Sequence, residues 1–480
     1  MLLRALLLIV LAFAPAAAEA RHGRPNVIVI LADDLGVQDV GAYGHRSAVP
    51  TPNIDKLAAR GVRFDRGYAT APVCSPSRAA LMSGRYQQRQ GFEYLIPERQ
   101  NEGGGAPGLD PEQRILPEAL KGRGYRTAAV GKWHLGDTPD RLPTARGFDS
   151  FFGFLPGEIA YMDRSRPGLT SVPAPYLGER SFTRRLDYTK VGRWRAGSTT
   201  RELVANDDSY LTEELTREAV AFIDANRRRP YFLYLAHLAP HSPFQATTKY
   251  LDRFPNERDP LKRTYAAMVS ALDDSVGEVM AAVEASGRAD NTIIVFSADN
   301  GAATYMNVSD CTGAIAGGKL AMWEGGVRVP LIVSWPARWP KGVVEKRNVS
   351  LMDVAPTIVA AAGAAADPAS DGVDLSPRVA GADRDAPIHD TLFWRLGHEY
   401  AVLQGDTKLI SNTRPGAFPW LLDLASDPGE TRNQLFGQRA KAADLVARYK
   451  RWSAGLRDPA WPSKETLQVF HCGRISFNDQ

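Results

Sequence analysis

Four short apolar runs spaced along the chain constrain its fold more than any other feature. They begin at Val27, Tyr125, Tyr231 and Thr292. Runs of this kind are typical of strands buried on both faces of a parallel sheet. Stretches with helical periodicity, such as 208–227 and 265–286, lie between them. This alternation predicts an α/β fold with a large, mostly parallel sheet flanked by helices.

Polar residues directly follow each of the four runs. They are Asp33, Asp34, Lys132, His134, His237, Asp299 and Asn300. Because the carboxyl ends of parallel strands lie along one edge of a sheet, we expect these side chains to converge there. The carboxylate and amide oxygens suit a hard divalent cation, and the scarcity of Cys and His ligands disfavours zinc. The alternative is that the adjacent aspartates form a solvated turn.

Cys74 lies at the start of a predicted helix. Ser75 is its expected N-cap, Pro76 its first helical residue, and Gly84 is expected to end it. A helix N-terminus is electropositive and favours a reactive thiol, although a buried structural cysteine is the alternative. Together with the convergent charges, the pattern indicates a metal-assisted hydrolase of an anionic ester, with Cys74 as nucleophile by elimination. These residues do not distinguish phosphate from sulfate.

The N-terminus resembles a cleavable secretory signal over residues 1–20, with Arg4 before a short apolar run. That run is too short to span a bilayer, so we expect a secreted or periplasmic protein without stable membrane insertion. A net charge of +4 over 480 residues, without a dense basic stripe, argues against nucleic acid as a partner. Cys311 and Cys472 are left as a possible disulfide.

Composition also predicts how the chain is divided. Residues 155–205 are rich in arginine and form either a solvated insertion or a loop that meets an anionic substrate. Residues 362–388 read as a boundary, followed by short strands and a final helix. We therefore expect a catalytic domain over 21–385 and a small antiparallel α+β subdomain over 386–480.

Two motifs resemble the signatures of the type I sulfatases. The first is Cys74-Ser75-Pro76-Ser77-Arg78 with Leu81 and Gly84-Arg85, and the second is Gly124-Tyr125-Arg126-Thr127 leading to Gly131-Lys132-Trp133-His134-Leu135-Gly136. The similarity continues through Asp299-Asn300-Gly301, Gly318-Lys319, Glu324-Gly325-Gly326 and Asp427-Pro428-Gly429-Glu430. It implies the alkaline phosphatase superfamily fold and an arylsulfatase-like enzyme that depends on formylglycine.

The resemblance also implies roles for individual residues. Cys74 would be oxidised to formylglycine by a transient maturation enzyme and hydrated in the site. One Ca²⁺ would be bound by the modified Cys74 together with Asp33, Asp34, Asp299 and Asn300. Arg78 and Lys132 would hold the hydrated aldehyde, and Lys132, His237 and Lys319 would bind the sulfate group.

In the implied mechanism, a hydroxyl of the hydrate attacks sulfur and forms a sulfated enzyme intermediate, with Asp299 as proton acceptor. His237 protonates the leaving alcohol, with His241 as the alternative acid, and His134 then assists release of sulfate. The expected substrate is a sulfate monoester on a sulfated sugar or oligosaccharide. A phosphonate or phosphate ester hydrolase of the same superfamily and an inactive glycan-binding homologue remain the alternatives.

Overall fold

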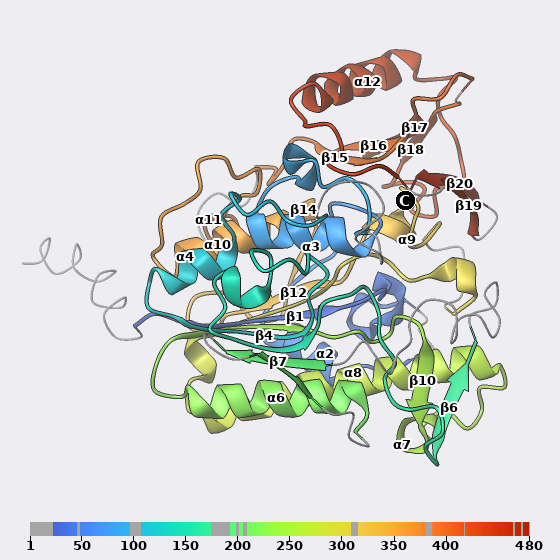
Figure 1. Ribbon diagram of the computed structural model, residues 1–480. Coiled ribbons are helices and arrows are strands. Elements are labelled where there is room, and N and C mark those ends of the chain that lie inside the picture. The colour runs from blue at the N-terminus through green and yellow to red at the C-terminus, as the bar shows by residue number, and fades with distance from the viewer. Residues whose placement is uncertain are drawn as a thin grey trace, which may run out of the picture.

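The computed structural model describes most of the chain (Figure 1). The described ranges are 23–45, 49–96, 107–173, 193–197, 201–204, 209–308, 315–380, 386–416, 418–463, 466–471 and 474–479. The predicted signal at 1–20 and the predicted disulfide partners Cys311 and Cys472 lie outside them. Within the described ranges, no helix is long and apolar enough to cross a membrane.

A ten-stranded sheet forms the centre of the molecule (Figure 1). From one edge to the other its strands are β13 (Val343–Glu345), β2 (Val62–Phe64), β12 (Leu331–Ser334), β11 (Thr292–Ala298), β1 (Asn26–Ala32), β9 (Tyr231–Ala236), β4 (Arg126–Lys132), β5 (Ser150–Phe154), β7 (Arg193–Gly197) and β8 (Arg201–Val204). The central strands from β11 to β5 are all parallel, whereas β12, β7 and β8 introduce antiparallel pairs towards the edges. This arrangement confirms the predicted α/β class.

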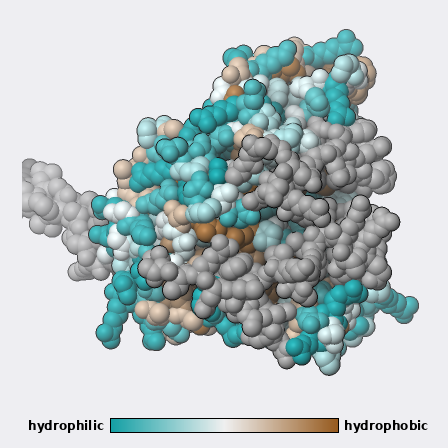
Figure 2. Space-filling model, viewed as in Figure 1, coloured by the Kyte–Doolittle hydropathy of each residue, from teal (hydrophilic) through white to brown (hydrophobic). Residues whose placement is uncertain are grey.

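Helices cover both faces of this sheet (Figure 1). One face carries α2 (Pro52–Ala59), α6 (Leu211–Ala225) and α8 (Pro260–Ala285), and the other carries α3 (Cys74–Ser83), α4 (Leu116–Lys121) and α10 (Val354–Ala361). Every residue of β1 is buried between the two layers, which explains its unbroken apolar sequence. Hydrophilic residues predominate on the outer surface in the view of Figure 2.

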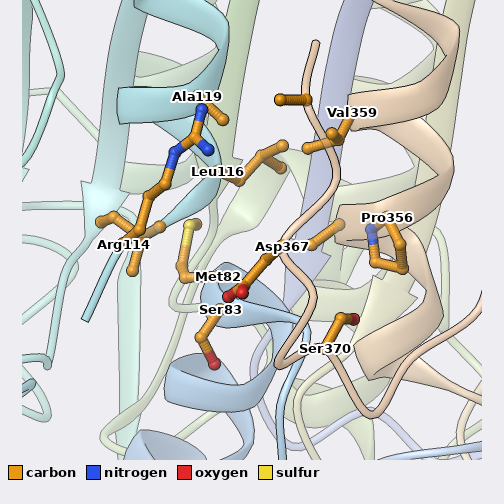
Figure 3. A pocket seen from close by; sticks show the side chains of 12 residues that line it. Met82, Ser83, Arg114, Leu116, Ala119, Pro356, Val359, Asp367 and Ser370 are labelled. Carbon is orange, nitrogen blue, oxygen red and sulfur yellow. The ribbon is translucent and has the colours of Figure 1, made fainter.

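A small hollow lies between α3, α4 and α10 (Figure 3). Its volume is about 30 Å³, which is room for about one water molecule. Apolar side chains such as Met82, Leu116 and Val359 supply much of its lining. We interpret it as a packing imperfection between helices of one layer.

The register of the sheet aligns the carboxyl ends of four neighbouring strands. Ala32 of β1 pairs with Ala298 of β11, and Leu31 pairs with Ala236 of β9. Ala236 in turn pairs with Gly131 of β4. The polar residues that end or follow these strands therefore start from neighbouring positions on one edge.

The arginine-rich region 155–205 is more ordered than the sequence predicts. Its described parts include β6 (Leu169–Val172), which pairs with β10 (Phe244–Thr247), as well as β7 and β8. Arg195 forms a salt bridge with Glu218 at 2.5 Å and lies over the ring of Phe152. Arg195 thus supports the sheet edge, and these described parts of the region form strands rather than a loop. Arg180, Arg184 and Arg185 lie outside the described residues.

The C-terminal region forms the predicted small antiparallel sheet. Its elements are β15 (Leu392–Leu396), β16 (Glu399–Gln404), β17 (Thr407–Asn412) and β18 (Trp420–Asp423), with α12 (Arg439–Ser453) packed against β16 and β17. Short elements elsewhere are β3 (Gly67–Tyr68) with β14 (Val349–Ser350), β19 (Thr466–His471) with β20 (Arg474–Asp479), α7 (Thr248–Leu251), α9 (Glu324–Val327) and α11 (Ser376–Val379). The Trp394 indole N–H donates to the carbonyl oxygen of Ala69 at 2.6 Å, joining the small sheet to the main body.

A buried charge network also crosses this junction. The Lys408 ammonium of β17 donates to Glu324 at 2.8 Å and to Glu430 at 3.1 Å. The other Glu430 oxygen accepts the backbone N–H of Glu324 at 2.8 Å, and the Tyr68 hydroxyl donates to Glu324 at 3.1 Å. Lys408 and Glu430 are fully buried. Because Glu324 begins α9, the network fixes the segment that follows Lys319.

We predict that Lys408→Met lowers the free energy of unfolding by about 3–5 kcal/mol, because it leaves two buried carboxylates without their cation. The exposed Lys450 of the same subdomain is the control, and Lys450→Met should change it by less than about 0.5 kcal/mol. Equilibrium urea unfolding followed by circular dichroism measures both. Equal stability of the two variants would contradict the network's role.

Candidate active site

The polar residues predicted to converge do meet at the carboxyl edge of the sheet. Asp33 and Asp34 follow β1, Asp299 and Asn300 follow β11, and Lys132 ends β4. Their side chains are buried. Asp34 and His134 have positive φ angles of 62° and 55°. Left-handed backbone is costly for residues other than glycine and is concentrated at functional sites, so these two positions support the assignment of a site here.

Cys74 lies in the middle of this group. Helix α3 begins at Cys74 with the extended Val73 as N-cap, so the prediction that Ser75 is the N-cap is wrong, whereas Gly84 ends the helix as predicted. The Cys74 sulfur lies 3.4 Å from an oxygen of Asp33 and 4.0 Å from one of Asp34. Burial, together with the negative charge of Asp33, raises the pKa of the thiol well above its usual range. The helix N-terminus therefore does not make Cys74 a thiolate.

Three cations and three carboxylates surround Cys74 and pair with one another. The pairs are Arg78–Asp299 at 2.7 Å, Arg78–Asp33 at 3.3 Å, Lys132–Asp33 at 2.5 Å and Lys319–Asp34 at 2.8 Å. All six side chains are at least nine-tenths buried. Unpaired charges would be very costly there, so the sequence supplies equal numbers of each sign.

The pairing sets the protonation of the carboxylates. Burial alone would raise the pKa of Asp33 and of Asp34, but Lys132 and Lys319 respectively hold the two values below the usual range. The pKa of Asp299 is raised by burial and by the negative charge of Asp33. Asp33 and Asp34 are thus ionised near neutral pH and available as anionic ligands.

The oxygen atoms at this edge fit a divalent cation. One ligand atom each from Asp33, Asp34, Cys74 and His241 can be chosen so that all four lie within 4.8 Å of one another. The amide nitrogen of Asn300 donates to Asp34 at 2.7 Å, while its buried carbonyl oxygen has no hydrogen-bond partner among the described residues. A bound cation would satisfy that oxygen, and such oxygen-rich sets suit hard cations.

The predicted histidines are not all at the site. His134 is buried beside Lys132, and burial and that positive charge lower its pKa well below the usual range. His237 donates its backbone N–H to Leu31, which extends the strand pairing, and its ring bonds to Ser275 of α8 at 2.9 Å. Burial lowers the pKa of His237 to about 3. Its ring is therefore held by the helix layer, and His237 is not part of the group of residues whose ligand atoms lie close enough to share a cation.

His241 lies where the sequence analysis placed His237. Its Nε2 atom is 3.6 Å from an oxygen of Asp34. Its Nδ1 atom lies 2.6 Å from the carbonyl oxygen of Ser242 and 3.8 Å from the carboxylate of Glu158. His241 is part of a turn beyond β9, and His237 was favoured because it follows the strand directly.

Two residues of the arginine-rich region reach the site without having been predicted. Glu158 is buried beside His241, and the hydroxyl of Ser242 donates to it at 3.3 Å. At Gly157, a Cβ atom would lie 2.9 Å from the ring of His134, so a side chain there would displace the histidine. No strand pattern or motif marked either position.

The fold and the buried, balanced charges are typical of an enzyme that acts on anionic esters. A family model described as Sulfatase matches residues 25–364, and a model of the N-sulphoglucosamine sulphohydrolase C-terminal region matches residues 318–452. The chain belongs to the sulfatase family and is a sulfatase, an enzyme that hydrolyses sulfate esters. The predicted family and enzyme class are confirmed.

Similar proteins come from animals and bacteria. N-acetylgalactosamine-6-sulfatase of Canis lupus familiaris is 33% identical over 463 residues, covering 88% of this chain and 84% of its own. Arylsulfatase A of Homo sapiens is 32% identical, covering 92% and 89%. Among solved structures, Ps i-CgsB in complex with k-i-k-neocarrahexaose superposes with a TM-score of 0.80 at 33% identity, covering 92% of this chain and 95% of the other. The phosphonate monoester hydrolase of Agrobacterium radiobacter, at 21% identity and a TM-score of 0.61, shares the fold.

Proposed function

We propose that this sulfatase removes sulfate from a sulfated sugar or oligosaccharide, using formylglycine made from Cys74 and one bound Ca²⁺. The observation that carries the proposal is the buried, charge-balanced cluster around Cys74. The glycan substrate is supported by the N-acetylgalactosamine-6-sulfatase relatives and by the similar structure of Ps i-CgsB in complex with k-i-k-neocarrahexaose.

The charge balance favours an anionic ester as ligand, and a sulfate monoester meets this requirement. Three carboxylates and three cations cancel, and the Cys74 thiol is neutral. A divalent cation held by Asp33, Asp34, Asp299 and Asn300 would leave the site with an excess of positive charge. A sulfate monoester carries one negative charge, which this excess would attract. Lys132 and Lys319 are placed to bind its oxygens.

The chemistry of formylglycine accounts for the central position of Cys74 in the site. A hydrated aldehyde supplies two hydroxyls on one carbon, so the enzyme can be regenerated without a second attack at sulfur. The guanidinium of Arg78 is held close to this position by Asp299 and Asp33, and the N-terminus of α3 adds a partial positive charge that would favour an anion. The runner-up is a phosphonate or phosphate ester hydrolase, whose substrates would carry a similar charge.

We further propose that His241 protonates the leaving alcohol and that His134 receives a proton when sulfate is released. Both rings lie beside the charged cluster, whereas His237 bonds to Ser275 in the helix layer. Glu158, 3.8 Å from Nδ1 of His241, would stabilise the protonated ring. The proposed general acid is therefore His241, which the sequence analysis gave as the alternative to His237.

Maturation and export follow from the same hypothesis. Every residue from Cys74 to Arg78 is buried in the folded protein. A formylglycine-generating enzyme, the expected transient partner, must therefore reach this motif before folding is complete. The signal-like residues 1–20 support export to the periplasm or the medium, without stable membrane insertion.

Replacing Cys74 tests the reaction. Cys74→Ala should reduce hydrolysis of an aryl sulfate by about 10³-fold or more, because the nucleophile is removed. Circular dichroism should show an intact fold. Mass spectrometry of the wild-type peptide that contains position 74 should detect the aldehyde. An unchanged rate in the variant would refute the assignment, and faster hydrolysis of the matched aryl phosphate by wild type would favour the runner-up.

Removal of the cation should lower thermal stability as well as activity. Adding CaCl₂ at 100 times its dissociation constant to chelator-treated enzyme should stabilise the fold by about 2.7 kcal/mol. The expected readout is a rise in Tm by differential scanning fluorimetry. Asn300→Ala should shrink the rise because it removes one ligand, and a rise of equal size with MgCl₂ alone would argue against calcium.

The roles of His241 and His237 can be distinguished by comparing substrates whose leaving groups differ in their need for a proton. His241→Asn should lower kcat about 10²-fold or more for an alkyl sulfate, whose alcohol needs a proton, and much less for p-nitrophenyl sulfate. His237→Asn should show no such dependence on the leaving group, because its ring contacts Ser275. The proposal fails if the pattern is reversed.

A further inference from the structure

A second site lies at the junction of the main body and the C-terminal subdomain. It is a cleft of about 820 Å³, and none of the residues assigned to the active site lines it. One wall consists of residues that follow β2 and β13, together with Arg328 after α9. The other wall consists of residues 387–390, the turn between β16 and β17, and the first turn of α12.

The cleft is cationic. The positive side chains on its walls are Arg66, Arg328, Lys346, Arg347 and Lys441. The three carboxylates on the walls are each paired with an arginine, in the pairs Asp65–Arg63, Asp390–Arg448 and Asp406–Arg66. Arg63 and Arg448 do not line the cleft, but their positive charges neutralise two of these carboxylates. Arg347 and Arg328 are paired in turn with Glu345 and Glu324, which also lie outside the lining, so the excess positive charge of the cleft rests on Lys346 and Lys441.

Two lysines supply much of this excess. Lys346 and Lys441 are exposed, and neither forms an ion pair or hydrogen bond through its side chain with any residue that the structure describes. They stand on opposite walls, one after β13 and the other in the first turn of α12. Paired arginines and free lysines facing one cleft are suited to sulfate groups, which accept several charge-assisted hydrogen bonds.

The strand directions place this cleft on the same edge of the sheet as the active site. Both β11 and β2 are antiparallel to β12, so they run in the same direction, and β13 is parallel to β2. Residues that follow β2 and β13 therefore emerge at the edge where Asp33 and Asp299 lie. Three strand spacings separate β1 from β2, or about 14 Å. One short segment carries both Lys319 of the active site and Arg328 of the cleft.

We infer that this cleft binds a second sulfated part of a glycan chain, away from the ester being cleaved. The inference rests on the glycan substrate proposed above. It predicts an enzyme that holds polymeric or multiply sulfated substrates better than small sulfate esters. Nucleic acid is disfavoured, because the two lysines without an ion pair on the walls are too few for a continuous run of phosphates.

The test compares two double variants with the same change in charge. Lys346→Glu with Lys441→Glu alters the cleft. The control is Lys341→Glu with Lys450→Glu, which alters exposed lysines outside the cleft, one before β13 and one near the end of α12. Both pairs are placed in the Cys74→Ala background, and binding of dextran sulfate is measured by isothermal titration calorimetry at fixed ionic strength.

The cleft variant should bind dextran sulfate about tenfold more weakly than its parent, and the control less than about twofold more weakly. In the background with Cys74 intact, both should retain wild-type kcat/KM for p-nitrophenyl sulfate. Equal loss in both variants, no loss in the cleft variant, or equally tight cleft-dependent binding of duplex DNA would overturn the inference. Binding does not need turnover, so failure of the proposed reaction would show separately, as absence of p-nitrophenyl sulfate hydrolysis by wild type.

Discussion

The contact of Asp33 with Lys132 and Arg78 is the interaction on which the site depends most. Asp33 is fully buried, and its ionised form is tolerable only because both cations lie against it. The buried carboxylates of Asp299 and Asp34 are stabilised in the same way, by ion pairs with Arg78 and Lys319 respectively. The result is a group of buried charges that come from five different parts of the chain. Such an arrangement is already organised around a sulfate group before the substrate arrives.

The C-terminal subdomain takes part in this organisation although it supplies none of these charges. Lys408 reaches across the junction to Glu324, which begins the turn that follows Lys319. Glu430 accepts the backbone N–H of Glu324, so the turn is held by both its side chain and its main chain. The same segment continues to Arg328 at the cationic cleft. Docking of the small sheet thus fixes one active-site lysine and forms one wall of the second site.

The sequence predicted the buried strands, from their apolar runs, and the site residues that lie directly at the ends of those strands. The apolar strands and the residues that directly follow them, including Asp33, Lys132 and Asp299, were found because parallel strands share one edge. The positions of His241 and Glu158 in the site could not be predicted in this way. Both lie in turns or irregular segments, and the local sequence does not show in which direction such a segment turns. The start of α3 was missed for a related reason. Ser75 and Pro76 are good capping residues, yet the helix begins at Cys74, and its N-cap Val73 makes no side-chain capping bond that the sequence could have signalled.

The burial of Cys74 gives the clearest link between folding and chemistry. A thiol whose pKa is raised by burial and by Asp33 is a poor nucleophile, so the folded protein suppresses the chemistry expected of an unmodified cysteine there. The same carboxylates suit a neutral, hydroxyl-bearing group, since they can accept hydrogen bonds from it. Under the proposed function, conversion of Cys74 to such a group would have to precede final packing of α3, because Cys74 to Arg78 are buried in the folded protein. Burial of these residues would then set the order of the two events, with modification first and completion of the fold second.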